Sequence, residues 1–540
     1  MAARLATVTT THPPSIQVSP LVTTAVARTL RIGATEYPLV LPSVRDPRLH
    51  LAGVIITIHV LGQVALGFTV SVPQIVAAIL TCALIEAGWT FYRSRQLVWP
   101  ASAMLTGSGV ALILRVLGTG RGDHWTWYGV HVFALVAGGS LVTKYVIRYR
   151  GVHVFNPSNV GLVAAFLVLG SERVAPLDFW WAPLDAWMVA AYVVIVVGGL
   201  VITNRLRLLA TAAAFWLVLT AGLGVLAASG HCMTTGWALQ PVCGTYFWWV
   251  VATSPEVLIF LFFMITDPKT IPAGPAARVV FAGAVGLVAA LLIAPQTAEF
   301  GAKVGLLAGL AVMSPLRWLV DGLLPEPVAG RARGRAVDLH PLRVFARGAL
   351  VGAAAVVAAV AIVVAGSPAR VSAQALPAVA PPAIDVDVDP ATIPPVALDA
   401  EVAALNSDIV ADGGRGLALL LAENLAVEAQ AVLRGDPALL RAADHGDRLA
   451  ALEQQIARSG TAGDRVVADY TFDSLHLSVI FTEGSQGGPG LGFSATGMVD
   501  QITYDAGGTE LARATAPFAT MFVMRQALGD RFLIVATQSP

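Results

Sequence analysis

The chain has few charged residues and few cysteines. Of its 540 residues, 13% are charged and 56% are hydrophobic, whereas about 25% of an ordinary globular chain is charged. The net charge is zero, so nothing in the balance of charge favours nucleic acid as a partner. No spacing of His and Cys indicates a metal or haem site.

The N-terminal segment 1–50 also lacks the basic, apolar and cleavage regions of a signal peptide. We therefore expect the first membrane-spanning helix to direct the chain to its membrane. Residues 1–30 are rich in Thr, Ser and Pro, and we predict that they are disordered.

Long apolar runs alternate with short polar joints between residues 51 and 320. A spanning helix needs about 20 mostly apolar residues because the hydrocarbon layer is about 30 Å thick. The runs predict eleven spans, at 51–69, 73–92, 98–117, 127–146, 155–170, 184–203, 208–229, 247–266, 278–295, 301–320 and 348–366.

The Lys and Arg residues in the joints predict the orientation of these spans. With a cytoplasmic N-terminus, fifteen basic residues lie in the inside joints and only four in the outside joints. The parity of the spans then places the C-terminal part outside the cytoplasm. It also places the loop with Cys232 and Cys243 outside, where an oxidising compartment permits a disulfide between them.

These patterns divide the chain into six parts. A cytoplasmic, partly disordered segment (1–50) precedes a membrane domain with ten helices (51–320). A basic cytoplasmic connector (321–347) leads to the eleventh helix (348–366). A linker rich in Pro and Ala (367–397) then leads to an extracytoplasmic α+β domain (398–540).

The ten spans before the connector form two groups of five, and an odd number of spans per group predicts an inverted repeat. The third span opens with Trp99-Pro100 and the eighth with Ser254-Pro255-Glu256. Breaks at matching positions are typical of inverted-repeat carriers close to their central site. The alternative is local, because Pro is common at the first position of any helix.

The fifth span opens with the polar run Asn156-Pro157-Ser158-Asn159. Backbone groups at membrane depth need partners within the protein, so this run predicts an irregular segment that lines a cavity. We expect Ser158 or Asn159 to cap the following half-helix. The alternative is a plain helix cap at the membrane surface.

The eighth span ends with Thr266-Asp267-Pro268-Lys269, also on the cytoplasmic side. The two polar segments can therefore approach one another. We predict that Thr266, Asp267 and Lys269 contact a polar ligand or form a re-entrant turn.

Ionisable residues in or near the spans are further candidates, because retained charges in lipid face protein or water. Glu86 and Glu256 are predicted to belong to an ion pathway; the alternative for Glu86 is a salt bridge with Lys144 or Arg115. Near the fifth span, three residues are candidates for binding a phosphate or anionic headgroup, unless they are a simple positive-inside flank: Arg148, Arg150 and His153.

The C-terminal part reads as a soluble α+β domain. Leu417, Leu421 and Leu425 recur at helical spacing, and a second helix is predicted to start at Asp436-Pro437. From Val466 the pattern has a period of two, and further strands are predicted at 491–504, 508–524 and 531–537. Helices followed by a curled sheet resemble the NTF2/SnoaL-like cone fold. The candidate catalytic residues of this domain cannot be arranged into a credible catalytic set; they are His445, Asp473 and His476. This favours a binding module.

Two motifs of the membrane domain resemble the RnfD/NqrB family of membrane subunits of ion-pumping, flavin-dependent redox complexes. They are Val154-Phe155-Asn156-Pro157 and Phe263-Met264-Ile265-Thr266-Asp267-Pro268. The resemblance covers about residues 51–320, and it implies a five-plus-five inverted repeat. The longer run 144–159 and Ser254-Pro255-Glu256 are similar to the UnbU-type branch, which is associated with enediyne biosynthesis clusters.

The resemblance implies a bacterial plasma membrane location and contact with other membrane redox subunits. Family members with covalent flavin mononucleotide attach it to a Thr in the joint after the Asn-Pro helix. Here that joint, residues 171–179, contains no Thr. Any flavin is therefore expected to bind noncovalently.

Three functions remain open from the sequence. The first is a membrane subunit for electron transfer or coupled ion transport, which would be an enzyme only as part of a redox complex. The second is a permease or channel-like protein without a redox cofactor. The third is an assembly or biosynthesis accessory protein that presents its outer domain to extracytoplasmic partners.

Overall fold

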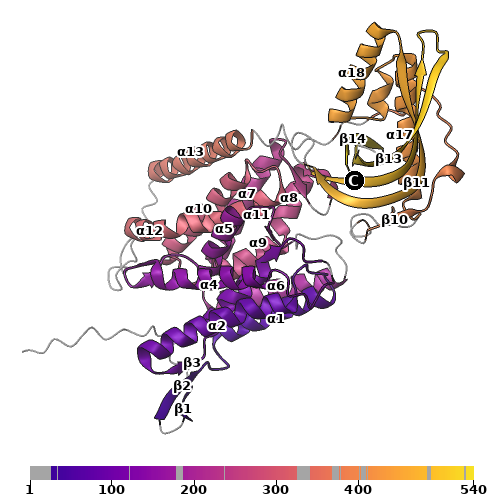
Figure 1. Ribbon diagram of the computed structural model, residues 1–540. Coiled ribbons are helices and arrows are strands. Elements are labelled where there is room, and N and C mark those ends of the chain that lie inside the picture. Colours follow the sequence, from indigo (N-terminus) through magenta and orange to yellow (C-terminus); the bar gives the residue numbers. More distant parts are fainter. Residues whose placement is uncertain are drawn as a thin grey trace, which may run out of the picture.

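The computed structural model describes most of the chain as a helical part followed by a smaller domain built on a sheet (Figure 1). The described residues are 26–32, 35–120, 122–177, 186–235, 238–324, 341–367, 376, 379–399, 402, 409, 412–482, 488–527 and 531–539.

Eight described helices are long and apolar enough to cross a membrane, judged by length and composition. Seven of them lie in predicted spans, and four shorter apolar helices occupy the remaining predicted spans. The eighth, α17 (Arg415–Arg434), belongs to the C-terminal domain, because its Leu417, Leu421 and Leu425 pack in the core of that domain. The chain is thus a multi-pass membrane protein with a C-terminal sheet domain.

The helices of the membrane part follow one another with short joints. The first five are α1 (Pro47–Val64), α2 (Val72–Ser94), α3 (Ala101–Ile113), α4 (Val130–Val146) and α5 (Pro157–Leu169). The next are α6 (Ala186–Arg205), α7 (Leu209–Ala228), α8 (Gly244–Thr253), α9 (Pro255–Ile259), the π-helix η2 (Phe260–Met264), α10 (Pro275–Ile293) and α11 (Glu299–Met313). They are followed by η3 (Ser314–Leu316), α12 (Arg317–Leu323) and α13 (Pro341–Ala365).

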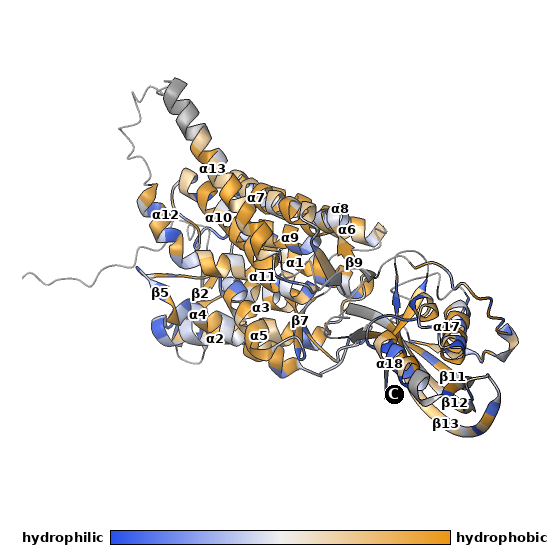
Figure 2. Ribbon diagram, turned by 90° about the horizontal axis from the view of Figure 1, so that it is seen from above, coloured by the Kyte–Doolittle hydropathy of each residue, from blue (hydrophilic) through white to orange (hydrophobic). Residues whose placement is uncertain are grey.

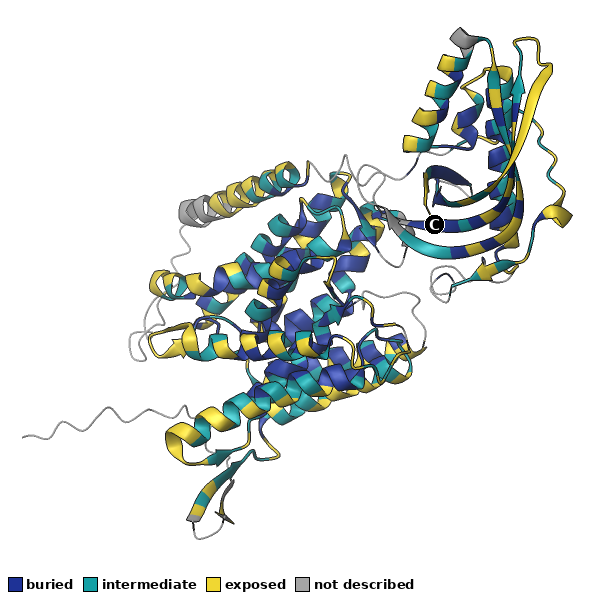
Figure 3. Cartoon of the chain, in the orientation of Figure 1, coloured by how far each residue is buried: buried dark blue, intermediate teal, exposed yellow. Residues whose placement is uncertain are grey.

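The helices of this bundle are coloured mainly as hydrophobic in Figure 2, and many of their residues are coloured as exposed in Figure 3. Leu84, Leu135 and Leu167 are 71%, 72% and 72% exposed. Apolar surface on this scale is costly in water but is the expected lipid-facing surface of a membrane bundle. Inside the bundle, small residues allow close helix approach: a Cβ on Gly107 of α3 would lie 2.4 Å from the Ala78 carbonyl oxygen of α2.

The third and fifth predicted spans form half-helices, which was expected of the fifth span but not of the third. α3 and α5 have 13 residues each, or about 20 Å at 1.5 Å per residue, which is too short for a 30 Å layer. Each is followed by a short strand, β4 (Leu114–Val116) and β7 (Val174–Pro176), and these strands pair antiparallel. Their pairing satisfies backbone groups that would otherwise lack partners in lipid.

The predicted eighth span, 247–266, is also interrupted. α8 ends at Thr253, and Ser254 starts α9, where its Oγ accepts a hydrogen bond from the Val257 amide at 3.2 Å. The chain then continues as the π-helix η2. π-helical turns are frequent at functional sites.

Small hairpins close several joints. β8 (Cys232–Thr235) and β9 (Ala238–Cys243) pair antiparallel, and a disulfide joins Cys232 to Cys243. β5 (Arg148–Tyr149) and β6 (Val152–His153) form a hairpin before α5. β1 (Val26–Ile32), β2 (Thr35–Leu41) and β3 (Leu97–Val98) form a small sheet. The predicted disorder is wrong for residues 26–30, which lie in β1; residues 1–25 lie outside the described part.

In its described residues, the C-terminal domain is a five-stranded curved sheet with two helices. Its strands lie in the order β10 (Val396–Leu398), β11 (Arg465–Thr482), β12 (Gly488–Tyr504), β13 (Glu510–Gln526) and β14 (Phe532–Gln538). Side chains of α17 pack on this sheet against Phe493 and Phe522. The predicted strands are therefore confirmed to within a few residues at most of their ends.

The second predicted helix of this domain starts later than expected. Short 3-10 turns form at η4 (Pro390–Thr392) and η5 (Leu439–Ala442), and α18 covers Gly446–Ala462. Between η5 and α18 the backbone pairs with β14, where the His445 amide donates to the Ile534 carbonyl at 3.0 Å. This pairing prevents a continuous helix from Asp436.

Candidate functional site: a cavity between two broken segments

The first wall of the site is the start of α5. Asn156 caps this helix: its Oδ1 accepts from the Asn159 amide at 3.3 Å and from Ser158 Oγ at 2.9 Å. The expectation that Ser158 or Asn159 is the cap is wrong, because the Ser158 hydroxyl is a donor to the cap. Asn156, Ser158 and Asn159 are all buried, so a polar helix start lies inside the protein.

The second wall is the end of the eighth span. Thr266 Oγ1 bonds to the Phe262 carbonyl oxygen within the π-helix. Asp267 then makes a turn in which its Oδ1 accepts from the Lys269 amide at 3.1 Å. The buried Arg317 donates to the Lys269 carbonyl oxygen. Arg317 therefore holds this turn in place.

A cavity of about 290 Å³ lies between these two walls. Seven of the ten residues predicted to bind a ligand or cofactor line this cavity, whereas Asn159, Arg148 and Arg150 do not. The seven are His153, Asn156, Pro157, Ser158, Thr266, Asp267 and Lys269. The structure thus brings together two segments that the whole of α6 and α7 separates in the sequence.

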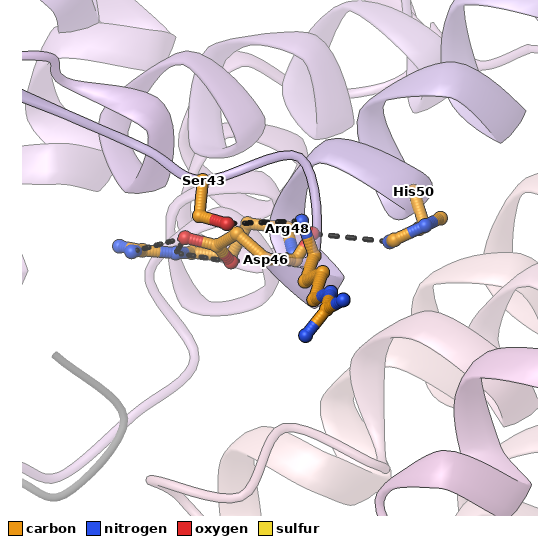
Figure 4. A network of polar contacts seen from close by, with 5 residues as sticks. Ser43, Asp46, Arg48 and His50 are labelled. Carbon is orange, nitrogen blue, oxygen red and sulfur yellow. Dashed lines mark hydrogen bonds and ion pairs between the residues drawn. The ribbon is translucent and has the colours of Figure 1, made fainter. Parts of the chain in front are cut away.

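The start of α1 adds a third wall that the sequence did not indicate. Asp46 caps this helix and accepts from the Arg48 side chain at 2.6 to 3.1 Å (Figure 4). His50 Nδ1 lies 3.1 Å from the Asp46 carbonyl oxygen. Burial raises the pKa of Asp46, but the hydrogen bonds from Arg48 outweigh it and lower the pKa. Asp46 and Arg48 both line the cavity as a paired carboxylate and guanidinium.

The cations of the cavity differ in their partners. Lys144 Nζ lies 2.9 Å from Glu86 Oε1, and Arg48 pairs with Asp46. Lys269 makes no ion pair among the described residues and lines the cavity. Lys269 is therefore the cation best placed to meet an anionic ligand.

His153 is the titratable neutral group of the cavity. Burial lowers the pKa of His153 to about 4, although the nearby Asp267 carboxylate acts in the opposite direction. His153 is consequently uncharged at neutral pH, and it can accept or donate a hydrogen bond without adding charge.

The remaining predicted residues lie elsewhere. Arg148 and Arg150 are exposed on the β5–β6 hairpin and do not line the cavity. Glu86 forms the salt bridge with Lys144 that was its alternative explanation. Glu256 pairs with Lys303 at 3.2 Å at a second, smaller cavity.

All three lysines of the chain line one of the two cavities. The chain has 34 Lys and Arg residues, of which only Lys144, Lys269 and Lys303 are lysines. Lys144 and Lys269 line the large cavity, and Lys303 lines the small one. Unlike arginine, lysine readily loses its proton when its surroundings favour the neutral form.

No model of a known protein family matches the chain, and no curated protein is found to be similar to it. The RnfD/NqrB family therefore remains a resemblance of motifs.

Proposed function

We propose that this multi-pass membrane protein binds an amphipathic ligand in the large cavity, with the anionic end of the ligand towards Lys269. The observation that carries the proposal is the meeting of the Asn156-Pro157-Ser158 helix start and the Thr266–Lys269 turn at one cavity. A helix start presents amide groups and the positive end of the helix dipole, both of which favour an anion.

The opposite walls favour an apolar ligand body. Ile55, Leu105, Ile259, Phe262 and Phe263 also line the cavity. An apolar pocket with a few convergent polar groups is the usual form of a small-molecule site. A ring system or acyl chain with one phosphate or carboxylate group matches this distribution.

We further propose that the protein acts as a membrane subunit of RnfD/NqrB type, in electron transfer or coupled ion transport. The packing of the helices supports two similar halves: α2 contacts α4 as α7 contacts α10, and α1 contacts α3 as α6 contacts α9. α1 also contacts α6, and α5 contacts α11. Such equivalent pairs are expected of an inverted repeat with its site at the interface of the halves.

A flavin fits the residues of this cavity. Lys269 and the start of α5 would hold the phosphate, and Phe262 and Phe263 would lie against an apolar ring system. When bound, a flavin supplies one- and two-electron transfer. The protein's own groups provide the neutral His153 and the Arg48–Asp46 pair as fixed polar contacts around the ligand.

The orientation proposed from the basic joints has a cytoplasmic N-terminus in a bacterial plasma membrane. In that orientation the large cavity belongs to the cytoplasmic half, and the C-terminal domain lies outside. We propose that this domain is an NTF2-like module that binds a partner protein or a small molecule; its helices on one curved sheet support this proposal.

The absorbance spectrum of the purified protein tests the redox proposal. A flavin spectrum whose chromophore is released into the supernatant by acid precipitation supports noncovalent flavin. In Lys269→Met, the bound flavin should fall several-fold, whereas Arg150→Met should retain it, because Arg150 lies outside the cavity. A protein that binds no flavin, including flavin added at micromolar concentration, would contradict the redox proposal and favour a cofactor-free permease.

A further inference from the structure

The second cavity is small, with a volume of about 30 Å³, and lies beside Glu256 and Lys303. This volume accommodates two or three water molecules, since one water needs about 10–15 Å³ measured in this way. Apart from Glu256 and Lys303, the side chains that line it are apolar. A hydrated cation therefore has neither the room nor the oxygen ligands that it needs.

Lys303 is the centre of a buried polar cluster at this cavity. Its ammonium lies 2.6 Å from Glu299 Oε1 and 3.2 Å from Glu256 Oε1, and it donates to the Leu177 carbonyl oxygen at 3.0 Å. Lys303 is 3% exposed. Tyr192 of α6 is a further titratable neighbour of Glu256, and its hydroxyl donates to the Thr253 carbonyl oxygen.

The small cavity shares part of its wall with the large one. Leu112, Ile113, Ile259 and Met264 line both cavities. Ile259 and Met264 flank and end the π-helical turn of the eighth span. The two cavities are therefore neighbours, and Glu256 and Lys303 lie at the smaller one.

We propose that Glu256, Lys303 and Glu299 form a proton relay that is supplied by the water-sized cavity beside the large one. This inference rests on the proposed transport function of the large cavity. It assigns the path to protons and includes Lys303 and Glu299, which the sequence patterns did not indicate as functional.

The relay conserves protons and charge. A water molecule in the small cavity takes up one proton as it passes another to the Glu256 carboxylate, so the water itself is unchanged. Lys303 donates one of its protons to Glu299, and the neutral amine takes the proton held by Glu256. Glu299, at the start of α11, then releases a proton, so one proton enters and one leaves.

The choice of lysine is the chemical reason for a relay at this position. A guanidinium would pair with both carboxylates equally well, but it does not release a proton in proteins. The chain uses arginine at 31 of its 34 basic positions, yet it has lysine at the centre of this cluster.

Proton flux through the full-length protein in phosphatidylcholine–phosphatidylglycerol vesicles tests the relay. The vesicles contain a pH-sensitive dye, and a potassium gradient with valinomycin sets the membrane potential. Wild-type protein should raise proton flux several-fold over protein-free vesicles, and Glu256→Gln and Lys303→Arg should return it to that background. Glu256→Asp should keep part of the flux.

Glu172→Gln is the matched control, because Glu172 is exposed and lines neither cavity. Each variant is first checked for a wild-type gel-filtration profile and for flavin binding, which report on the fold and on the large cavity. Wild-type flux at background, or full flux in Glu256→Gln or in Lys303→Arg, would overturn the relay. Flavin binding with no flux would leave the proposed redox function standing while excluding the relay.

Discussion

The Asn159 side chain of α5 donates a hydrogen bond from Nδ2 to the Leu307 carbonyl oxygen of α11 at 3.0 Å. Both groups are buried, and the bond joins α5 to α11, which α6 to α10 separate in the sequence. Asn159 therefore acts on the large cavity indirectly, because it fixes the helix start whose cap lines that cavity.

Asn159→Ala should lower the stability of the protein by about 1 kcal/mol, the usual size of an interhelical hydrogen bond. The thermal unfolding midpoint in detergent, followed by tryptophan fluorescence, would measure this change. Asn204→Ala is the control, because Asn204 is exposed at the end of α6. Equal midpoints for the two variants would show that the bond contributes nothing.

Gly161 allows α5 to lie directly on α4. A Cβ at this position would lie 1.7 Å from Ser140 Oγ and 2.8 Å from Ser140 Cα. Gly161→Ala should therefore cost about 1–3 kcal/mol, the range for overpacked cores. The yield of monodisperse protein and its unfolding midpoint would show the loss.

Gly139→Ala is the matched control for that change, since no atom lies within 4 Å of its added Cβ. Ser140→Ala should fail to rescue Gly161→Ala, because the Ser140 Cβ itself would be 2.5 Å away. A stable Gly161→Ala protein would mean that α4 and α5 pack less closely than described.

The proposed orientation predicts opposite accessibility for two exposed positions. Thr509 lies between β12 and β13 of the C-terminal domain, and Ser94 lies at the end of α2. A membrane-impermeant maleimide should label Thr509→Cys in intact cells, but it should label Ser94→Cys only after permeabilisation. The reverse pattern would invert the topology and move the large cavity to the outer half of the membrane.

Asp444 should make the stability of the C-terminal domain depend on pH. Burial raises the pKa of Asp444 well above its ordinary value, and the neighbouring Glu428 carboxylate raises it further. The folded domain thus holds a proton that the unfolded chain releases near pH 4. The corresponding stability is complete below that pH and is lost as pH rises through the folded pKa.

Pulse proteolysis of the full-length protein in urea between pH 5 and 8, detected by a C-terminal tag, would measure this dependence. Asp444→Asn should flatten the pH profile, because the amide carries no titrating proton. Asp473→Asn removes an exposed carboxylate of the same domain and should keep the wild-type slope. A wild-type profile without a decline towards pH 8 would contradict the raised pKa.

Local composition was sufficient to predict the helices of the membrane part. Every predicted span from 51–69 to 348–366 contains a described helix, because the thickness of lipid requires a long apolar run for each crossing. The predicted end of the fifth span, at residue 170, is confirmed by α5, which ends at Leu169, but the sequence could not predict that α3 stops at Ile113. That outcome depends on pairing between β4 and β7, which α4 and α5 separate in the sequence.

The residues of the site divide in the same way. The polar run at Asn156 and the turn at Asp267 were visible as breaks in apolar segments, and their common cavity was expected from their shared side of the membrane. Hydropathy does not indicate which charged side chains form ion pairs. It therefore could not decide that Glu86 pairs with Lys144 or that Glu256 pairs with Lys303.

The sequence by itself determined where the chain lies in lipid and which segments break, since solvation of each segment depends on its own residues. Only the tertiary structure decided which groups share a cavity, because contacts such as Asn159 with Leu307 join positions 148 residues apart. The large cavity, the Lys303 cluster and the apolar wall that the two cavities share are all consequences of such distant contacts.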